Sequence, residues 1–215
     1  MVGITSSPAR ALSGTAVVPA DKSISHRSVI FGALADGVTE VTNLLTGEDV
    51  LATVAAFRDM GVSIEGPDSG HLRISGVGKF GLQAPEKEVD LGNSGTSIRL
   101  LSGLLAGQRF HSRLTGDDSL RRRPMGRVVD PLTAMGGVIQ SSEGYPPLDV
   151  HPGKGLIGIE YRMPVASAQV KSALLLAGLY AEAETVIYEP TPTRDHTERM
   201  LAGFSNGQWT AGAPI

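Results

Sequence analysis

The chain has 215 residues, 41% of them hydrophobic and 5% aromatic, which suits one large or two small domains with an aliphatic core. A formal net charge of -3 argues against broad nucleic-acid binding, and the absence of cysteine excludes disulfides and thiolate metal sites. No apolar stretch reaches the roughly 18 residues of a membrane-spanning helix, and the start of the chain lacks the apolar region of a signal peptide, so we expect a cytoplasmic protein without membrane partners.

The first group of predicted elements follows a loose leader that we expect at residues 1–12. A polar cluster opens the first predicted helix with the sequence Asp21-Lys22-Ser23-Ile24-Ser25-His26-Arg27. Apolar residues then recur at helical spacing, which predicts one buried face made of Val29, Ile30, Ala33 and Leu34. A strand is predicted over residues 38–45, and a second, amphipathic helix from the turn 47–49 to Met60-Gly61. Strands at 62–64 and 72–74 are predicted to form a hairpin around 66–70.

The same order of elements recurs about 70 residues later. A second polar cluster opens an apolar helix with the sequence Gly92-Asn93-Ser94-Gly95-Thr96-Ser97-Ile98-Arg99. A strand over 109–114, an acidic turn at 116–118 and an amphipathic helix ending at Met135-Gly136 are predicted to follow. The strand 138–140 completes this copy, and Pro146-Pro147 predicts a loop after it. Each copy therefore reads as a βαβαββ unit.

A third copy begins at the sequence Ala166-Ser167-Ala168-Gln169-Val170-Lys171-Ser172. A strand over 185–188 and a helix after the turn 193–195 are predicted next, with Thr197, Met200, Leu201 and Phe204 on its packed face. The pattern then requires another strand, but residues 205–215 are rich in glycine and small side chains. We therefore expect that the natural sequence has been cut, or read out of frame, near position 205; a native flexible terminus is the alternative.

Each of the three clusters is a helix start that carries hydroxyl, amide or basic side chains. Free N–H groups and the positive end of the helix dipole favour phosphate or carboxylate at such a position. Three of them in one fold predict a site for an anionic small molecule. In the acidic turns, we interpret Asp49, Asp118 and Asp195 as N-caps of the second helices. His26 and His196 are interpreted as packing or hydrogen-bonding residues rather than bases.

Five motifs, in order, resemble those of 5-enolpyruvylshikimate-3-phosphate synthases: the 21–27 cluster, Leu91 to Thr96 with Arg99, Arg123-Pro124-Met125, Ala166 to Gln169 with Lys171 to Ala173, and Arg194 to Glu198. The resemblance covers residues 13–204, which we expect to form one domain, and looks like the bacterial class noted for glyphosate-tolerant members. It implies an α/β fold of three repeated βαβαββ units around buried helices, one domain of the inside-out α/β barrel of enolpyruvyl transferases.

The resemblance also implies an activity, the transfer of the enolpyruvyl group from phosphoenolpyruvate to shikimate 3-phosphate without metal or organic cofactor. The reaction requires protonation of the enol carbon, attack by a hydroxyl group and loss of phosphate. In the family, a second half supplies the general acid and base candidates, and this chain contains no counterpart of that half. A complementary C-terminal half is therefore an expected partner.

Residue roles follow from the matching positions. Lys22 matches a lysine that contacts both substrates and is the expected catalytic residue, because its point charge suits phosphate or carboxylate. The residues expected to bind shikimate 3-phosphate are Lys22, Ser23, Arg27, Ser167, Ala168 (through its backbone), Gln169 and Arg194. Those expected to bind phosphoenolpyruvate are Lys22, Asn93, Gly95, Thr96, Arg123 and Gln169. The resemblance implies no metal ligand.

Two departures from the family pattern are visible: Ala20 stands where Gly is usual, and Leu100 where many members have Pro. Two other functions stay open. The chain could be a non-catalytic phosphoshikimate-binding fragment that needs a complementary chain. It could also be a UDP-N-acetylglucosamine enolpyruvyl transferase, although the 21–27 cluster and the lack of the cysteine used by many of those enzymes argue against this.

Overall fold

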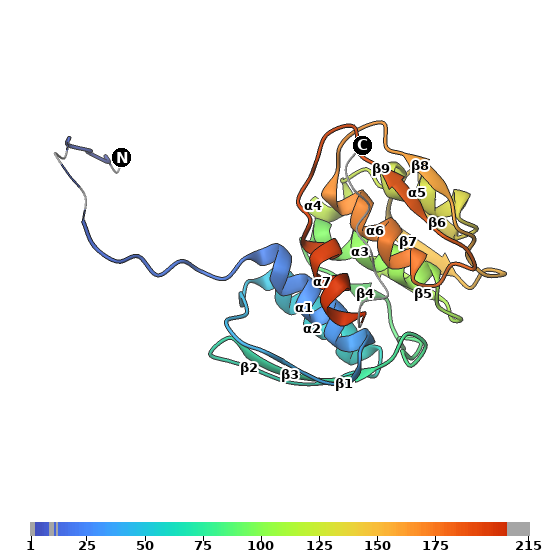
Figure 1. Cartoon of the computed structure of the whole chain (residues 1–215), viewed down its shortest axis with the longest axis horizontal. Coiled ribbons are helices and arrows are strands. Elements are labelled where there is room, and N and C mark those ends of the chain that lie inside the picture. The colour runs from blue at the N-terminus through green and yellow to red at the C-terminus, as the bar shows by residue number, and fades with distance from the viewer. Residues whose placement is uncertain (1–2, 9–10, 12, 206–215) are drawn as a thin grey trace.

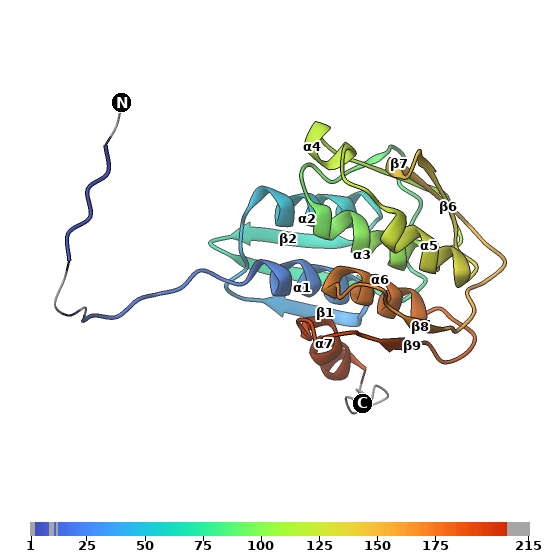
Figure 2. The ribbon, with the colours of Figure 1, turned by 90° about the horizontal axis from the view of Figure 1, so that it is seen from above.

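Three helices form the centre of the molecule, and each begins at one of the polar clusters (Figures 1 and 2). They are α1 (Lys22–Leu34), α3 (Gly95–Ala106) and α6 (Ala168–Gly178). The computed structural model describes residues 3–8, 11 and 13–205. The expectation of a single buried face is wrong for α1, because its second half is buried almost throughout. The other two helices are also buried continuously, α3 from Leu100 to Ala106 and α6 from Val170 to Ala177. A helix packed on several sides needs apolar residues all round.

Close contact between α3 and α6 depends on one glycine. A Cβ atom built on Gly103 lies 2.0 Å from the backbone oxygen of Ala173 in the facing helix. No other residue type fits there without moving a helix, since heavy atoms never approach so closely. The backbones of the two central helices therefore meet directly, and this contact brings their N-terminal ends together.

The first unit packs α1 and α2 (Glu48–Asp59) over a three-stranded antiparallel sheet (Figure 1). Its strands are β1 (Asp36–Val41), β2 (Ser63–Asp68) and β3 (His71–Val77), in the order β1-β3-β2. The prediction of a strand to residue 45 is too long, because Asn43 adopts a positive φ of 57°. The hairpin is confirmed, although its turn is Ser69-Gly70 and residues 66–68 belong to β2.

The second unit contains a four-stranded sheet in the order β4-β5-β7-β6. The strands are β4 (Val89–Asp90), β5 (Ser112–Thr115), β6 (Val138–Ser142) and β7 (Tyr145–His151). A short α4 (Asp118–Arg121) precedes α5 (Gly126–Ala134). The loop predicted at Pro146-Pro147 is wrong, because both prolines lie in β7. They occupy an irregularity in the ladder with β6, where a missing N–H costs no pairing.

The third unit pairs β8 (Glu160–Arg162) with β9 (Val186–Tyr188) in parallel, and α7 (His196–Phe204) follows. Thr197 and Leu201 of α7 are buried as predicted, whereas Phe204 is exposed and packs against Phe31 with the two rings tilted by 32°. Of the predicted tail, only Ser205 belongs to the described residues, where it follows α7 as a turn; residues 206–215 lie outside them.

The three units differ in completeness within the described residues. The middle one has all six elements of the βαβαββ pattern, whereas the first lacks the opening strand and the third lacks the closing pair. Residues 13–19 precede α1 as an exposed, extended segment that leads away from the helices and sheets (Figure 1). The α/β fold of repeated units around buried helices is confirmed, and so are the Met-Gly helix ends, where Gly61 and Gly136 have φ of 86° and 93°. Within the described part, no helix is both long and apolar enough to span a bilayer.

Candidate functional site

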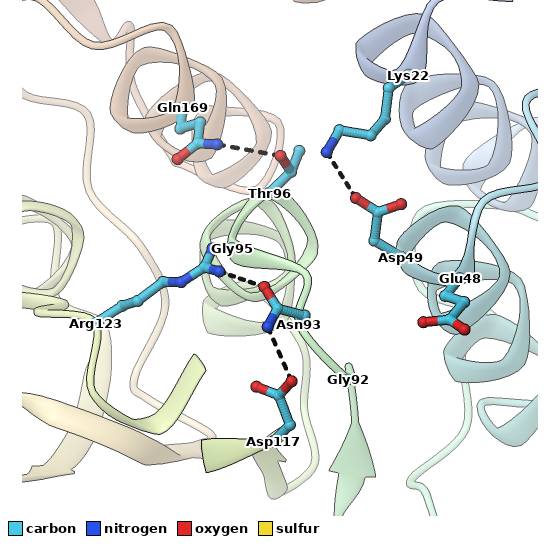
Figure 3. Close-up of a pocket in the computed structure, with 10 residues that line it drawn as sticks. All are labelled: Lys22, Glu48, Asp49, Gly92, Asn93, Gly95, Thr96, Asp117, Arg123 and Gln169. Atoms are coloured by element: carbon cyan, nitrogen blue, oxygen red, sulfur yellow. Dashed lines mark hydrogen bonds and ion pairs between the residues drawn. The ribbon is translucent and has the colours of Figure 1, made fainter. Parts of the chain in front are cut away.

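The N-terminal ends of the three central helices surround a cleft of about 550 Å³. One residue of each cluster caps its own helix: Asp21 accepts a hydrogen bond from the Ile24 N–H at 2.8 Å, Ser94 from Ser97 at 3.2 Å and Ser167 from Val170 at 3.3 Å. The residues next to these caps are thereby placed at the cleft. Figure 3 shows Lys22, Gly95, Thr96 and Gln169 around it, from three different helices.

Lys22 is held by an acidic side chain of the second helix in its unit. Its ammonium lies 2.7 Å from the Asp49 carboxylate, and both side chains line the cleft (Figure 3). Partial burial opposes ionisation of Asp49, but the hydrogen bond and charge of Lys22 outweigh it, so the pKa of Asp49 is lowered. The interpretation of Asp49 as a helix cap is wrong, because Gly47 occupies the N-cap of α2 and the Asp49 carboxylate faces Lys22.

On the opposite side of the cleft, Asn93 links Arg123 to Asp117 (Figure 3). Its amide oxygen accepts from the Arg123 guanidinium, and its amide nitrogen donates to Asp117 at 2.9 Å. Asp117 also caps α4 by accepting from the Leu120 N–H at 2.8 Å. Hydrogen bonds from Leu120 and Asn93 lower the pKa of Asp117.

The N-cap predicted at Asp118 is therefore one residue too late, because Asp117 caps α4. Asp195 does occupy the N-cap of α7, but its carboxylate binds Arg199 at 2.7 Å instead.

Gly95 is the point at which two arginines approach the backbone. A Cβ atom on this glycine would lie 2.5 Å from Arg123 Nη1 and 3.0 Å from Arg99 Nη1. Arg99 donates to the Gly95 carbonyl at 2.8 Å, and its pKa is lowered by burial and by the charges of Arg123 and Arg127. Positive charge is thus concentrated beside an open helix N-terminus, an arrangement that favours a bound anion.

A smaller hollow adjoins the cleft, and Thr96 and Gln169 line both. Gln169 donates to the Thr96 hydroxyl at 3.1 Å, which ties α6 to α3 between the two spaces. The remaining lining residues of the smaller hollow are Ser23, Arg27, Ala168, Arg194 and His196. Two cations therefore face this hollow as well.

Arg27 and Arg194 differ in how they are held. Arg27 is almost fully buried and donates to Thr197 at 2.6 Å, to the Ser23 carbonyl at 2.9 Å and to Ser172 at 2.6 Å. Burial and the nearby Arg194 charge lower its pKa to about 10, so it remains a cation near neutral pH. Arg194 is exposed and donates to the Ser23 hydroxyl at 3.1 Å. Arg27 is thus fixed by the protein, whereas most of the Arg194 guanidinium is free for a ligand.

His26 is a buried polar residue that lies next to the lining residue Asp49. His26 is fully buried, with Nδ1 2.8 Å from the Thr53 hydroxyl and 3.3 Å from that of Ser97. Its Nε2 has no hydrogen-bond partner among the described residues and lies 4.0 Å from Asp49. Burial lowers the pKa of His26 to about 4, against the opposing charge of Asp49, so the ring is neutral near pH 7. The interpretation of His26 as a hydrogen-bonding residue fits this position.

The predicted site residues fall into two sets. Those expected to bind phosphoenolpyruvate all line the larger cleft; of those expected to bind shikimate 3-phosphate, Ser23, Arg27, Ala168, Gln169 and Arg194 line the smaller hollow. Ser167 lines neither, because its hydroxyl caps α6. The sequence interpretation missed the lining residues Glu48, Asp49, Gly92, Asp117 and His196. Among described residues, no three His, Asp or Glu side chains form a group able to hold a metal ion.

Comparison with known proteins gives concordant matches. A family model described as EPSP synthase (3-phosphoshikimate 1-carboxyvinyltransferase) matches residues 7–207. The 3-phosphoshikimate 1-carboxyvinyltransferase of Nitrosococcus oceani is 61% identical over 209 residues, which cover 97% of this chain and 47% of the relative. That of Acidithiobacillus ferrooxidans is 64% identical over 197 residues, covering 92% and 45%. A solved structure of EPSP synthase from Acinetobacter baumannii superposes with a TM-score of 0.87 at 59% identity, covering 89% of this chain and 43% of that one. The chain spans about half the length of these relatives.

Proposed function

The chain belongs to the EPSP synthase family, and from this premise we propose that it is the substrate-binding half of a 3-phosphoshikimate 1-carboxyvinyltransferase. It binds shikimate 3-phosphate and phosphoenolpyruvate for enolpyruvyl transfer in the shikimate pathway of aromatic amino-acid biosynthesis. The observation that carries the proposal is the pair of adjoining hollows, whose linings divide the expected residues between two anionic substrates.

Phosphoenolpyruvate is assigned to the larger cleft. Arg123 offers a planar fork that suits a carboxylate or phosphate, and the Gly95 backbone at the start of α3 leaves room for a close approach. Lys22 faces them across the cleft and supplies a second cation. Asn93 fixes the Arg123 guanidinium before the substrate arrives, which reduces the entropy lost on binding.

Shikimate 3-phosphate is assigned to the smaller hollow. The Ser23 hydroxyl, the backbone at Ala168 and the exposed guanidinium of Arg194 converge there at the open ends of α1 and α6. Gln169 and Thr96 form the border between the two substrates. The substrate hydroxyl that attacks phosphoenolpyruvate then lies at this border, beside Lys22, which contacts both ligands in this arrangement.

The remaining chemistry belongs to a complementary half. Protonation of the enol carbon and removal of the hydroxyl proton require an acid and a base near the cleft. Two of the three carboxylates that line the cleft are engaged, Asp49 by Lys22 and Asp117 by Asn93 and a helix end. Glu48 alone is left for two proton transfers, so we assign at least one of them to a group outside this chain and expect little turnover by the chain alone.

Calorimetric titration of the chain with shikimate 3-phosphate tests this function, followed by titration with phosphoenolpyruvate at saturating shikimate 3-phosphate. Binding of both is expected, and Arg123→Met should weaken phosphoenolpyruvate at least about 10-fold, since hydrogen bonds to charged groups contribute about 1.5–3 kcal/mol. Arg122→Met is the matched control, because Arg122 is exposed and lines neither hollow. No binding of either substrate, alone or with the other half present, contradicts the proposal.

A phosphate-release assay separates this proposal from the purely non-catalytic alternative. Turnover that appears when the C-terminal half of a relative is added supports the half-enzyme; binding without turnover in that mixture supports a sequestering fragment. Competition by UDP-N-acetylglucosamine instead of shikimate 3-phosphate would favour the third function. We also propose a cytoplasmic location. The chain further resembles the class with glyphosate-tolerant members through its Ala166–Ala173 sequence. Inhibition of the assembled halves by glyphosate tests this assignment.

A further inference from the structure

A group of buried charges lies outside both hollows. Lys171 of α6 has a side chain only 6% exposed, and its ammonium lies 2.8 Å from the Glu189 carboxylate and 2.5 Å from that of Glu198. The two carboxylates are 19% and 17% exposed. Lys171 lines neither hollow, so its charge is committed to these partners. Removing one partner of such a pair leaves a charge with little access to water.

The two carboxylates belong to the two ends of the segment that carries Arg194. Glu189 directly follows β9, and Glu198 lies in the first turn of α7. Glu189 also accepts a hydrogen bond from the hydroxyl of Thr193, the residue before Arg194. One ammonium on the rigid central helix α6 therefore fixes both the start and the end of the segment, and Thr193 extends this connection to the neighbour of Arg194.

Apolar packing contributes little to the position of this segment. From 189 to 200, Thr197 alone is buried, and its hydroxyl bonds to Arg27 and Ser172. A segment with few buried apolar side chains opens easily unless polar contacts hold it. The contacts made by Lys171 are therefore the main connection between the segment and α6, apart from Thr197.

The charges of this group persist at neutral pH. Burial disfavours the Lys171 ammonium, but hydrogen bonds to Glu189 and Glu198 outweigh it and raise the pKa of Lys171. Burial likewise opposes ionisation of Glu189, and the hydrogen bonds from Lys171 and Thr193 outweigh it and lower its pKa. Lys171 and Glu189 are thus an ion pair at neutral pH, and the Glu198 carboxylate lies against the same ammonium.

We propose that Lys171, Glu189 and Glu198 form a positioning triad that holds Arg194 at the smaller hollow and thereby sets the affinity for the phosphate group of shikimate 3-phosphate. The inference rests on the proposed function, since it takes this molecule as the ligand. Lys171 contacts no substrate and acts through Arg194. Loss of the triad releases the segment, and the Arg194 guanidinium then samples positions away from the hollow.

The first test compares Lys171→Met with Lys171→Arg in the whole chain, by calorimetric titration with shikimate 3-phosphate and with shikimate, which lacks the phosphate. Lys171→Met should weaken shikimate 3-phosphate about 10-fold and leave shikimate nearly unchanged, because only the phosphate depends on Arg194. Lys171→Arg, which keeps a cation able to bind two carboxylates, should restore most of the affinity. Arg199→Met removes the exposed Asp195 pair on the same helix and should change neither ligand.

A double-mutant cycle with Arg194→Met separates positioning from a general structural effect. If Lys171 acts through Arg194, the Lys171→Met change should weaken shikimate 3-phosphate in the parent but have no further effect once Arg194 is gone. Additive losses, equal losses for shikimate and shikimate 3-phosphate, or an unchanged affinity in Lys171→Met would each overturn the proposal.

Two measurements keep the test decisive. If Lys171→Met does not fold, Glu198→Gln keeps the Lys171–Glu189 pair and should show the same phosphate-selective loss at a smaller size; an equal loss of both ligands overturns the triad. If the parent chain binds no shikimate 3-phosphate, alone or with the other half present, the proposed function fails, and amide hydrogen exchange then decides about the triad. Faster exchange in the flanking elements β9 and α7, whose amides are hydrogen-bonded, in Lys171→Met than in Arg199→Met supports the positioning role, and equal exchange refutes it.

Discussion

The first and third units contain the same connection in two different environments. In the first, Lys22 of the central helix α1 binds Asp49 at the start of α2; in the third, Lys171 of α6 binds Glu198 at the start of α7. The Lys22 side chain is 52% exposed at the cleft, whereas that of Lys171 is 6% exposed. An exposed lysine can exchange its carboxylate for a ligand at little cost, whereas a buried one cannot. A lysine–carboxylate pair therefore serves ligand binding in the first unit and, by our proposal, the positioning of Arg194 in the third.

Helix position explains the difference. Lys22 is the first residue of α1, and Lys171 is the fourth residue of α6, about one turn deeper. At the first turn, a side chain reaches the open space in front of the helix; one turn later it meets the packed elements around α6. The middle unit makes the corresponding connection with neutral and acidic groups, through Asn93 and Asp117.

The largest expected effect is on stability. Lys171→Met should lower the free energy of unfolding by about 3 kcal/mol, somewhat less than a fully buried pair loses, because both glutamates retain some exposure. Lys22→Met should change it by less than about 1 kcal/mol, since that pair faces solvent. Urea unfolding followed by circular dichroism measures both. Equal losses for the two variants would remove the distinction between the units.

The second prediction concerns how the stability of the first and third units depends on pH. The pKa of His26 is about 4 in the folded chain and about 6.5 in the unfolded one, so the unfolded state binds more protons between these values. Stability should therefore fall by about 3 kcal/mol as the pH decreases from 7 to 4, and His26→Gln should abolish most of this slope although it lowers stability at pH 7.

In the third unit, Glu189 titrates in a lower range. Because the pKa of Glu189 lies below its ordinary value of about 4.5, its contribution is complete above that pH and is lost only as the pH falls through the lowered value. Chemical unfolding at half-unit pH intervals resolves the two ranges. A His26→Gln variant with an unchanged slope between pH 6.5 and 4 would assign the loss to carboxylates instead.

A smaller effect should arise at Gly95. The methyl group of Gly95→Ala would force Arg123 and Arg99 to move, since both lie within 3.0 Å of the added Cβ atom. We expect phosphoenolpyruvate affinity to fall about 10-fold, equivalent to about 1.4 kcal/mol, and shikimate 3-phosphate affinity to stay unchanged. Titrations with each substrate check this. Gly92→Ala tests a backbone effect instead, because φ at Gly92 is 54° and no described atom lies within 4 Å of its added Cβ.

The smallest effect should follow Asp117→Ala. Loss of the α4 cap and of the Asn93 contact should lower the melting temperature slightly and weaken phosphoenolpyruvate only a few-fold, because Asn93 still meets Arg123. Asp118→Ala is the control, since Asp118 occupies the first turn of α4 without capping it. Thermal unfolding of the two variants distinguishes them, and a larger shift for Asp118→Ala would restore the cap predicted there.

The sequence was sufficient to predict the parts of the site that depend on local pattern. Helix starts, Met-Gly ends and the residues beside each cap follow from periodicity and capping, and the family resemblance assigned Lys22, Gly95 and Arg123 to one site. The burial of α1 and α6 on nearly all sides was not predictable this way, because it depends on which other elements surround a helix.

Contacts between distant carboxylates and cations were also beyond the local pattern. Asp49 reads equally well as a cap or as an ion-pair partner, and its distance from Lys22 depends on how α1 packs against α2. The Lys171 triad joins three elements, so no spacing rule reveals it, although a lysine within the apolar run of α6 was a signal that it needs buried partners.

The incomplete outer units leave two sheet edges uncovered within the described residues. β1 ends its sheet where β4 covers the equivalent strand of the middle unit, and β9 has β8 on one side only. Unpaired backbone donors and acceptors at an edge are templates for adding strands from other chains. Asp36 and Glu40 place exposed negative charges along β1, which discourages a second copy from pairing there, whereas β9 carries the sequence Val186-Ile187-Tyr188 without a charge. Concentration-dependent aggregation of the chain should therefore start at β9, and Tyr188→Lys is the change expected to improve its solubility, because Ile187 packs against the core and Tyr188 does not.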